Sequence, residues 1–202
     1  MHTAVWMKNS ICLKERSTKM LDLLIQNAHI IDGTGAPAYA GNVGVKNGKI
    51  QLNNLDDTAQ EIIDAKGLYV CPGFIDAHSH GDLALGQDYA TLCKVSQGIT
   101  TEITGQCGAS MFPVTLEQEE ELKGVLSVGT FSFPDEFCDY TSFEKYASYV
   151  NKTDKVLNLK ILVGHGSLRV AVMGFQNRKA TKEELEKMKM LLREAMEHGA
   201  LG

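Results

Sequence analysis

The sequence predicts an α/β protein, and two features of its pattern indicate this class. From residue 72 onward, strand-like and helix-like segments alternate, and the strand-like segments end in glycine-rich junctions. Before that point, residues 20–71 carry short apolar segments separated by turn signals. Alternating strands and helices with buried parallel strands are typical of a (β/α)8 barrel, which needs roughly 250 residues. Three units and the start of a fourth fit here, so we expect residues 72–202 to be the first half of a TIM-like barrel, an incomplete barrel.

Composition narrows the classes of function. The chain has 202 residues, a net charge of -5 and 44% apolar residues, so it can bury a core. Its basic residues are scattered, which argues against a nucleic-acid surface, and no apolar run is long enough to cross a bilayer. Five cysteines form an odd number without close pairs, which indicates free thiols in a reducing compartment. We therefore expect a cytoplasmic protein without nucleic-acid or membrane partners.

Residues 1–19 differ from the rest of the chain. They carry Lys8, Lys14, Arg16 and Lys19 but no continuous apolar core, so they do not form a secretory signal. A transit peptide is one interpretation of this composition. We favour a disordered extension that precedes Met20.

The β-region at residues 20–71 carries two hairpin signals. Asn47-Gly48 and Lys66-Gly67 each lie between two short apolar segments. Such pairs favour two-residue hairpin turns. We therefore expect antiparallel strands, too few to bury both faces of a sheet without a further layer.

Strand and helix patterns then follow in order. The β-branched run Ile99–Thr104 predicts a strand, and Thr181 with Glu184 forms a capping box that predicts a helix start. His198-Gly199 predicts the end of that helix. The other expected elements are helices at 87–97, 117–122 and 142–149, a strand at 157–163 and the start of a fourth strand at 200. The expected apolar faces are Tyr89, Leu92, Cys93 and Val95 in the first helix, and Leu185, Met188, Leu192, Ala195 and Met196 in the last, with Met190 also packed.

Two histidines follow the first strand of the alternating region. His78 and His80 lie two residues apart behind the apolar pair Phe74-Ile75, and side chains two apart on a strand point to the same face. Two neutral imidazoles that converge on one point are a metal-ligand arrangement. An exposed pair of histidines in a turn is the alternative. We favour metal binding, with Asp82 as a carboxylate at the rim or a turn former.

Cys107 lies just past the next strand, between glycines. A thiolate binds zinc readily, and the ends of neighbouring barrel strands converge on one face. Cys107 is therefore a candidate metal ligand or nucleophile, and a buried structural cysteine is the alternative.

Three other residues are candidates for substrate binding or for support of a metal ligand. Asp76 lies two residues before His78 and shares its face, so it is placed to orient a ligand. His165 follows the third strand, where it fits a ligand, a substrate contact or a loop anchor. Arg169 is suited to a substrate carboxylate, or is a surface charge.

The segment Pro72–Asp82 resembles the metal-binding strand of the amidohydrolase superfamily. The segment Gly105–Ser110 is similar to the branch of N-acyl-D-amino-acid deacylases, or D-aminoacylases, in which a cysteine is a metal ligand. The resemblance extends from about Met20 to Gly202, and Gln106 stands where relatives often have Asn. Further matching segments are Asp22–Gly35, Gly164–Arg169, Val172–Gly174 and Arg178–Thr181.

This resemblance implies a β-sandwich, to which residues 20–71 contribute strands, and a distorted (β/α)8 metal-dependent hydrolase barrel. It implies zinc as the cofactor, with His78 and His80 on a weaker metal position and Cys107 on the tightly held zinc. The family also uses two histidines and a catalytic aspartate from later strands, which we expect beyond Gly202. We therefore expect the 202-residue chain alone to have little or no activity.

The implied reaction is removal of the acyl group from an N-acyl-D-amino acid, a small-molecule substrate. A dihydroorotase or hydantoinase type of cyclic amidase is an alternative within the superfamily. A non-catalytic metal-binding fragment is the alternative outside enzymes.

Overall fold

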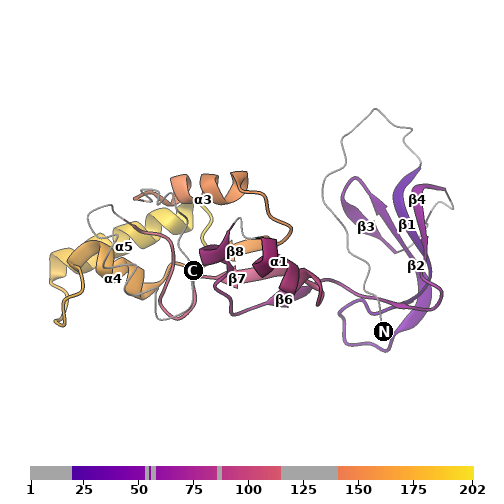
Figure 1. The fold of residues 1–202 in the computed structure, drawn as a ribbon, viewed down its shortest axis with the longest axis horizontal. Coiled ribbons are helices and arrows are strands. Elements are labelled where there is room, and N and C mark those ends of the chain that lie inside the picture. The colour runs from indigo at the N-terminus through magenta and orange to yellow at the C-terminus, as the bar shows by residue number, and fades with distance from the viewer. Residues whose placement is uncertain (1–19, 53–54, 56–57, 86–87, 115–140) are drawn as a thin grey trace. The chain divides into compact units, whose positions relative to one another are not determined.

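The computed structural model describes residues 20–52, 55, 58–85, 88–114 and 141–202, which form two compact units that divide between Gly73 and Phe74 (Figure 1). The expected extension at 1–19 and the expected helix at 117–122 lie outside the described residues. The sequence boundary was placed at 71/72, and the division into sandwich strands and half-barrel stays a prediction.

The first unit is a five-stranded mixed sheet. β1 (Leu21–Ile30) pairs antiparallel with β2 (Tyr39–Lys46), and β2 pairs antiparallel with β3 (Lys49–Gln51). β4 (Ala59–Asp64) and β5 (Tyr69–Val70) both pair parallel with β1, one after the other along it. The expectation of a purely antiparallel region is therefore wrong for two of the strand pairs.

The two turn signals have different outcomes. Asn47-Gly48 has φ angles of 50° and 72° and connects β2 to β3, so this hairpin is confirmed. The Lys66-Gly67 turn also has positive φ, but the flanking strands pair with β1 and not with each other among the described strands. Ala65 N donates to Gln26 O at 2.8 Å, which carries the chain onward along the same edge of β1. A turn signal fixes local backbone conformation but not the strand that each flanking segment joins.

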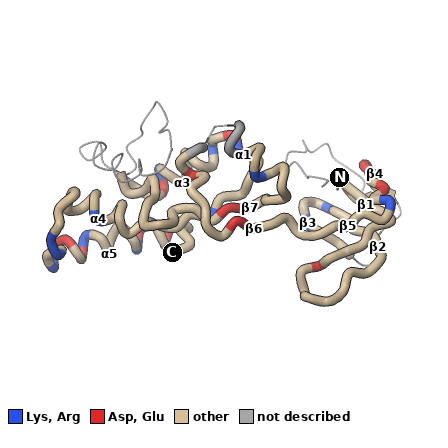
Figure 2. The backbone as a smooth tube through the Cα atoms, turned by 60° about the horizontal axis from the view of Figure 1, so that its bottom comes forward, with Lys and Arg blue, Asp and Glu red and all other residues tan. Residues whose placement is uncertain are grey.

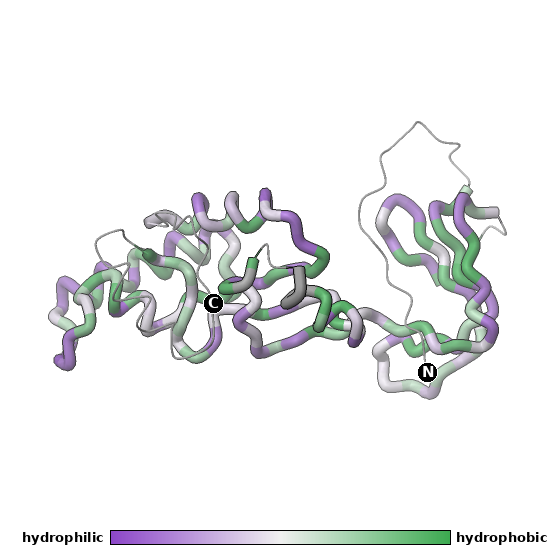
Figure 3. Tube along the Cα trace, viewed as in Figure 1, coloured by the Kyte–Doolittle hydropathy of each residue, from purple (hydrophilic) through white to green (hydrophobic). Residues whose placement is uncertain are grey.

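The apolar side chains of this sheet are only partly buried. Apolar stretches run along the central strand of the sheet, where Leu24 and Ile25 are both buried (Figure 3). Other apolar side chains remain exposed, among them Ile50, Ile62 and Tyr69. The expectation that so few strands do not bury both faces is confirmed for the described residues. The buried cluster consists of Ile25, Ala28, Ile30, Val43 and Ala65.

The second unit contains a three-stranded parallel sheet in the order β6-β7-β8. These strands are β6 (Phe74–Asp76), β7 (Ile99–Thr104) and β8 (Asn158–Ile161). Leu201 N donates to Ile161 O at 2.7 Å, and Val163 N donates to Gly202 O at 2.9 Å, so the chain continues the sheet beside β8. This agrees with the expected start of a further strand.

Helices connect and cover the strands of this sheet. A 3-10 helix, η1 (Gly81–Ala84), and α1 (Asp88–Val95) lie between β6 and β7, and α3 (Phe143–Lys152) precedes β8. α4 (His165–Met173) and α5 (Lys182–Glu197) follow β8. The Thr181 capping box and the helix stop at His198 are confirmed. α4 was not predicted, because its N-cap is Gly164 and has no side chain to cap the helix.

The core of the second unit is aromatic at its centre. Phe112 and Phe143 pack edge to face with ring centroids 5.3 Å apart, and both are almost fully buried. Of the expected helix faces, Met188 and Ala195 are buried. The prediction is wrong for five side chains that are exposed, because spacing shows which face is apolar but not whether another element covers it. These exposed side chains are Leu92, Cys93, Leu185, Met190 and Met196.

Candidate metal centre

The two histidines lie just beyond the end of β6. β6 ends at Asp76, so His78 and His80 lie in the connection to η1. The expectation that they lie on the strand itself is therefore wrong. The connection still runs beside β7, because Ser79 N donates to Ile103 O at 3.0 Å. The two imidazole rings therefore stay on one side, with centroids 5.9 Å apart.

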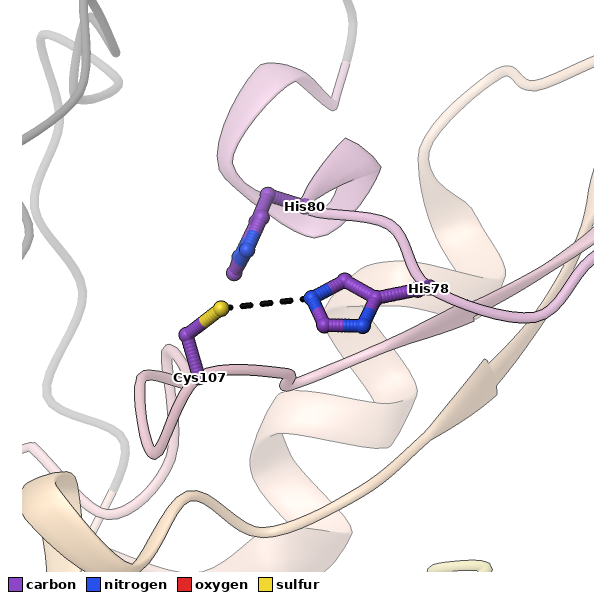
Figure 4. Close-up of side chains that lie close together, drawn as sticks. All are labelled: His78, His80 and Cys107. Atoms are coloured by element: carbon purple, nitrogen blue, oxygen red, sulfur yellow. Dashed lines mark hydrogen bonds between the residues drawn. The ribbon is translucent and has the colours of Figure 1, made fainter.

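Cys107 comes from the loop that follows β7. Its backbone has φ 56°, a left-handed conformation, between Gly105 and Gly108 with φ angles of 79° and 76°. The thiol Sγ lies 3.2 Å from His78 Nε2 (Figure 4). Gln106 Nε2 donates to Ala77 O at 3.0 Å, which connects the cysteine loop to the histidine segment. Glycines on both sides let the chain turn back sharply and present the thiol.

The three donor atoms fit one small cation. One ligand atom from each of His78, His80 and Cys107 lies within 4.8 Å of the other two. Donors on one tetrahedral zinc are separated by about 3.3–3.6 Å, given Zn–N near 2.0 Å and Zn–S near 2.3 Å. A small side-chain movement therefore brings all three into coordination. Burial lowers the pKa of His80, and the neighbouring His78 and Lys94 add to this, which favours the neutral imidazole that binds metals.

A charged cluster lies beside these donors. Lys94, near the end of α1, forms ion pairs of 2.8 Å with Asp76 and with Glu102, and its Nζ donates to Ser79 Oγ at 2.5 Å. We call these four residues the Lys94 cluster. Figure 2 shows the acidic positions on β6 and β7. Burial alone would lower the pKa of Lys94, but its hydrogen bonds to Asp76 and Glu102 raise it, so the ammonium stays charged.

The sequence reasoning missed Lys94 and Glu102. Glu102 is a charged residue within a β-branched run, and it is buried at 3% exposure. A charge inside a predicted buried strand was the available signal, because such a group needs a partner nearby. Lys94 carried no such signal, since a lysine near a helix end is ordinary.

Asp82 is buried rather than exposed at a rim. It is 2% exposed within η1. Burial raises the pKa of Asp82 to about 7, and the Glu102 carboxylate adds to the rise. The interpretation of Asp82 as a rim carboxylate is therefore wrong.

The structure places the three supporting candidates in different roles. Asp76 accepts a hydrogen bond from the backbone N of His78 at 3.2 Å, so it holds the backbone of that residue. His165 is exposed in the first turn of α4. Arg169 donates to the carbonyl oxygens of Gln176 and Arg178 at 3.4 and 3.0 Å, which supports the chain after α4. The metal donors described above include none of these three, and their roles toward substrate stay predictions.

The loop that carries Cys107 is held against the start of α4. Ser167 Oγ accepts from Ser110 N at 2.9 Å and donates to Ser110 O at 2.8 Å, and both serines are fully buried. Ser167 N donates to Gly108 O at 3.1 Å. A Cβ at Gly164 would lie 2.5 Å from Gly108 backbone atoms, so only glycine fits there. The thiol position therefore depends on α4 as well as on β7.

We expect Ser167→Ala to lower the free energy of unfolding by about 2–3 kcal/mol. The change leaves the buried N–H and C=O of Ser110 without their partner, and each such group costs about 1–3 kcal/mol. Urea unfolding measures the difference. Ser96→Ala is the control, because the Ser96 hydroxyl donates to Cys93 O at an exposed site and its loss should cost less than about 0.5 kcal/mol. Equal unfolding midpoints for the two variants would contradict the role of Ser167.

Two imidazoles and a thiol beyond the C-terminal ends of parallel strands define a candidate metal centre in a mixed α/β protein. The chain belongs to the Amidohydrolase family, whose model matches residues 61–202.

Curated proteins and solved structures agree with this family. The chain is 40% identical over 185 residues to N-acyl-D-aspartate deacylase of Alcaligenes xylosoxydans xylosoxydans, covering 90% of this chain and 36% of that protein. It is 34% identical, with a TM-score of 0.76, to N-acyl-D-glutamate deacylase of Bordetella bronchiseptica in complex with zinc and a phosphonate inhibitor. A D-aminoacylase with a binuclear metal centre is 31% identical, also with a TM-score of 0.76. The alignments cover 91% and 90% of this chain and 38% of each of those two chains.

Proposed function

We propose that this chain forms part of a zinc-dependent N-acyl-D-amino-acid deacylase. The observation that carries the proposal is the meeting of His78, His80 and Cys107 within 4.8 Å, in a chain similar over most of its length to such deacylases. We further propose that residues 74–202 form the first part of a TIM-like barrel, with strands of a small sandwich before it.

The residues present would supply three of the metal ligands. His78 and Cys107 are exposed, so an acyl group can approach them from solvent. Zinc, if held by His78, His80 and Cys107, would supply a Lewis acid for an amide carbonyl and for water. The contribution of this chain is to hold the donors in place, through β7, the loop at 105–110 and the Lys94 cluster. Cys107 has to stay a free thiol for this role, which supports the proposal of a reducing, cytoplasmic location.

The substrate class is an N-acylated D-amino acid with a free carboxylate. The carboxylate calls for a cationic partner, and the Arg169 guanidinium already donates to two backbone carbonyls. We therefore place the main carboxylate contact outside the described residues. This agrees with the coverage, since the chain spans 36–38% of the length of the relatives reported above.

An assay of amide hydrolysis tests the proposal. The product of the complete reading frame that encodes this chain is incubated with zinc and N-acetyl-D-aspartate, N-acetyl-D-glutamate or N-acetyl-D-leucine, and release of the free amino acid is measured. We expect hydrolysis of the D-substrates that is lost on chelation and restored by zinc, with the L-isomers as controls. Hydrolysis of dihydroorotate or a hydantoin in place of the N-acyl-D-amino acids would contradict the proposal.

The 202-residue chain is assayed in parallel. We expect it to bind zinc with little or no turnover, because it spans only 36–38% of the length of the relatives reported above. Chelator-sensitive hydrolysis by this chain alone would overturn that expectation.

A further inference from the structure

The Lys94 ammonium connects three acceptors around the histidine segment. Its Nζ donates to Asp76 Oδ2 at 2.8 Å, to Ser79 Oγ at 2.5 Å and to Glu102 Oε2 at 2.8 Å. An ammonium has three N–H donors, so these contacts use its full capacity. Lys94 is therefore directed into the protein rather than to solvent.

Two of these acceptors lead to the backbone beside the histidines. Asp76 Oδ1 accepts from the N–H of His78 at 3.2 Å, while its other oxygen meets Lys94. Ser79 Oγ accepts from the N–H of Gly81 at 3.1 Å. These two amides belong to His78 and to the residue directly after His80. The ammonium is therefore connected to the backbone at each end of the histidine pair through one side chain, Asp76 or Ser79.

The third acceptor anchors the group to the sheet. Glu102 is on β7, its side chain is 4% exposed, and it also accepts a hydrogen bond from the Ser79 hydroxyl. The Ser79 hydroxyl then has one donated and two accepted hydrogen bonds, its complete set. Because Ser79 and Glu102 are buried, their hydrogen bonds to the ammonium are stronger than those at a surface.

We propose that Lys94 is a positioning residue for the two histidines. Together with Asp76, Ser79 and Glu102, it holds the backbone of residues 76–81 in the conformation that directs both imidazoles toward Cys107. The alternative is that Lys94 only attaches α1 to the sheet, without an effect on the histidine segment. The link from backbone position to metal binding rests on the function proposed above, whereas the backbone effect does not.

Amide hydrogen exchange of the metal-free 202-residue chain, followed by NMR, tests the backbone effect. We expect Lys94→Met to speed exchange at His78 and Gly81 by about tenfold. The variant loses the hydrogen bonds of the ammonium to Asp76 and Ser79, the two side chains that accept from these amides. Lys155→Met is the matched control: Lys155 is also partly buried, but its ammonium donates to Val150 O, and it should leave these two amides unchanged. Faster exchange spread evenly over α1 and the sheet, or no change at His78 and Gly81, would overturn the proposal.

Lys94→Gln provides a second variant in case Lys94→Met does not fold. It ends both ion pairs but keeps a polar side chain beside Asp76 and Glu102, and it leaves the direct contacts of Asp76 with the His78 amide and of Ser79 with the Gly81 amide available. We expect faster exchange at His78 and Gly81. Unchanged exchange at both amides would contradict the proposal.

Zinc titration of the same proteins separates the two proposals. We expect Lys94→Met to bind zinc about 10–100-fold more weakly than the parent chain, as is typical when a group that supports metal ligands is lost. In the cobalt-substituted protein, the thiolate-to-cobalt absorption should persist, because Cys107 is held by its own loop, while the bands that report coordination number change. A parent chain that binds no zinc would reject the metal site, and the exchange measurements would still decide the role of Lys94.

Discussion

Replacement of Cys107 by alanine should weaken zinc binding by the 202-residue chain about 100-fold. Four ligands of zinc-finger peptides together contribute about 10–16 kcal/mol, so one thiolate contributes roughly 3 kcal/mol. The thiol is exposed and its ring partner lies 3.2 Å away, so its loss should affect the metal far more than the fold. A competition titration against a chelator of known affinity measures the zinc dissociation constant.

Cys93→Ala is the matched control for this experiment. Cys93 is also a free, exposed cysteine, but it lies on α1 and outside the donor group. We expect its zinc affinity to equal that of the parent chain. If both variants bind zinc equally well, Cys107 is not a ligand.

Gly105→Ala should lower the free energy of unfolding by about 4 kcal/mol or more. Gly105 has φ 79°, and a Cβ there would overlap the carbonyl group of Leu162. That carbonyl belongs to backbone beside β8, where Leu162 N donates to Thr104 O at 2.9 Å, so it cannot move away without breaking the sheet. Losses this large are exceptional for one substitution and follow from such backbone overlap. Urea unfolding followed by circular dichroism measures the change.

Gly199→Ala separates overlap from conformational strain. Gly199 also has positive φ, at 102°, but a Cβ there meets nothing within 4 Å. Only the strain of the backbone conformation remains, about 1–3 kcal/mol. Similar unfolding midpoints for the Gly105 and Gly199 variants would show that the backbone of Leu162 leaves room for a Cβ at residue 105.

Local patterns predicted the elements that depend on neighbouring residues. The β-branched run at 99–104 became β7 with the same bounds, and the Thr181 capping box starts α5. The meeting of His78, His80 and Cys107 was also predicted, because the C-terminal ends of adjacent parallel strands lie together. This prediction depended on the order of the strands and not on their lengths. It therefore holds although β6 ends at Asp76, before the histidines.

Features that depend on distant partners were not predicted. Turn residues around Gly67 gave no information on whether β5 pairs with β4 or with β1. The Lys94 cluster combines residues from β6, the segment after it, α1 and β7; the buried charge of Glu102 indicated that a partner was needed but not which residue it would be. Neighbouring residues specify conformation, whereas the partner of a buried charge is set by the assembled fold.

The left-handed backbone at Cys107 restricts which donor atoms can occupy this position. Among residues other than glycine, asparagine and aspartate enter this conformation most readily, whereas β-branched side chains are excluded. Aspartate would therefore keep the path of the loop while it replaces a soft sulfur with a hard oxygen. Because His78 and His80 would remain as ligands, the exchanged site would still suit zinc, but without the sulfur that oxidation can block.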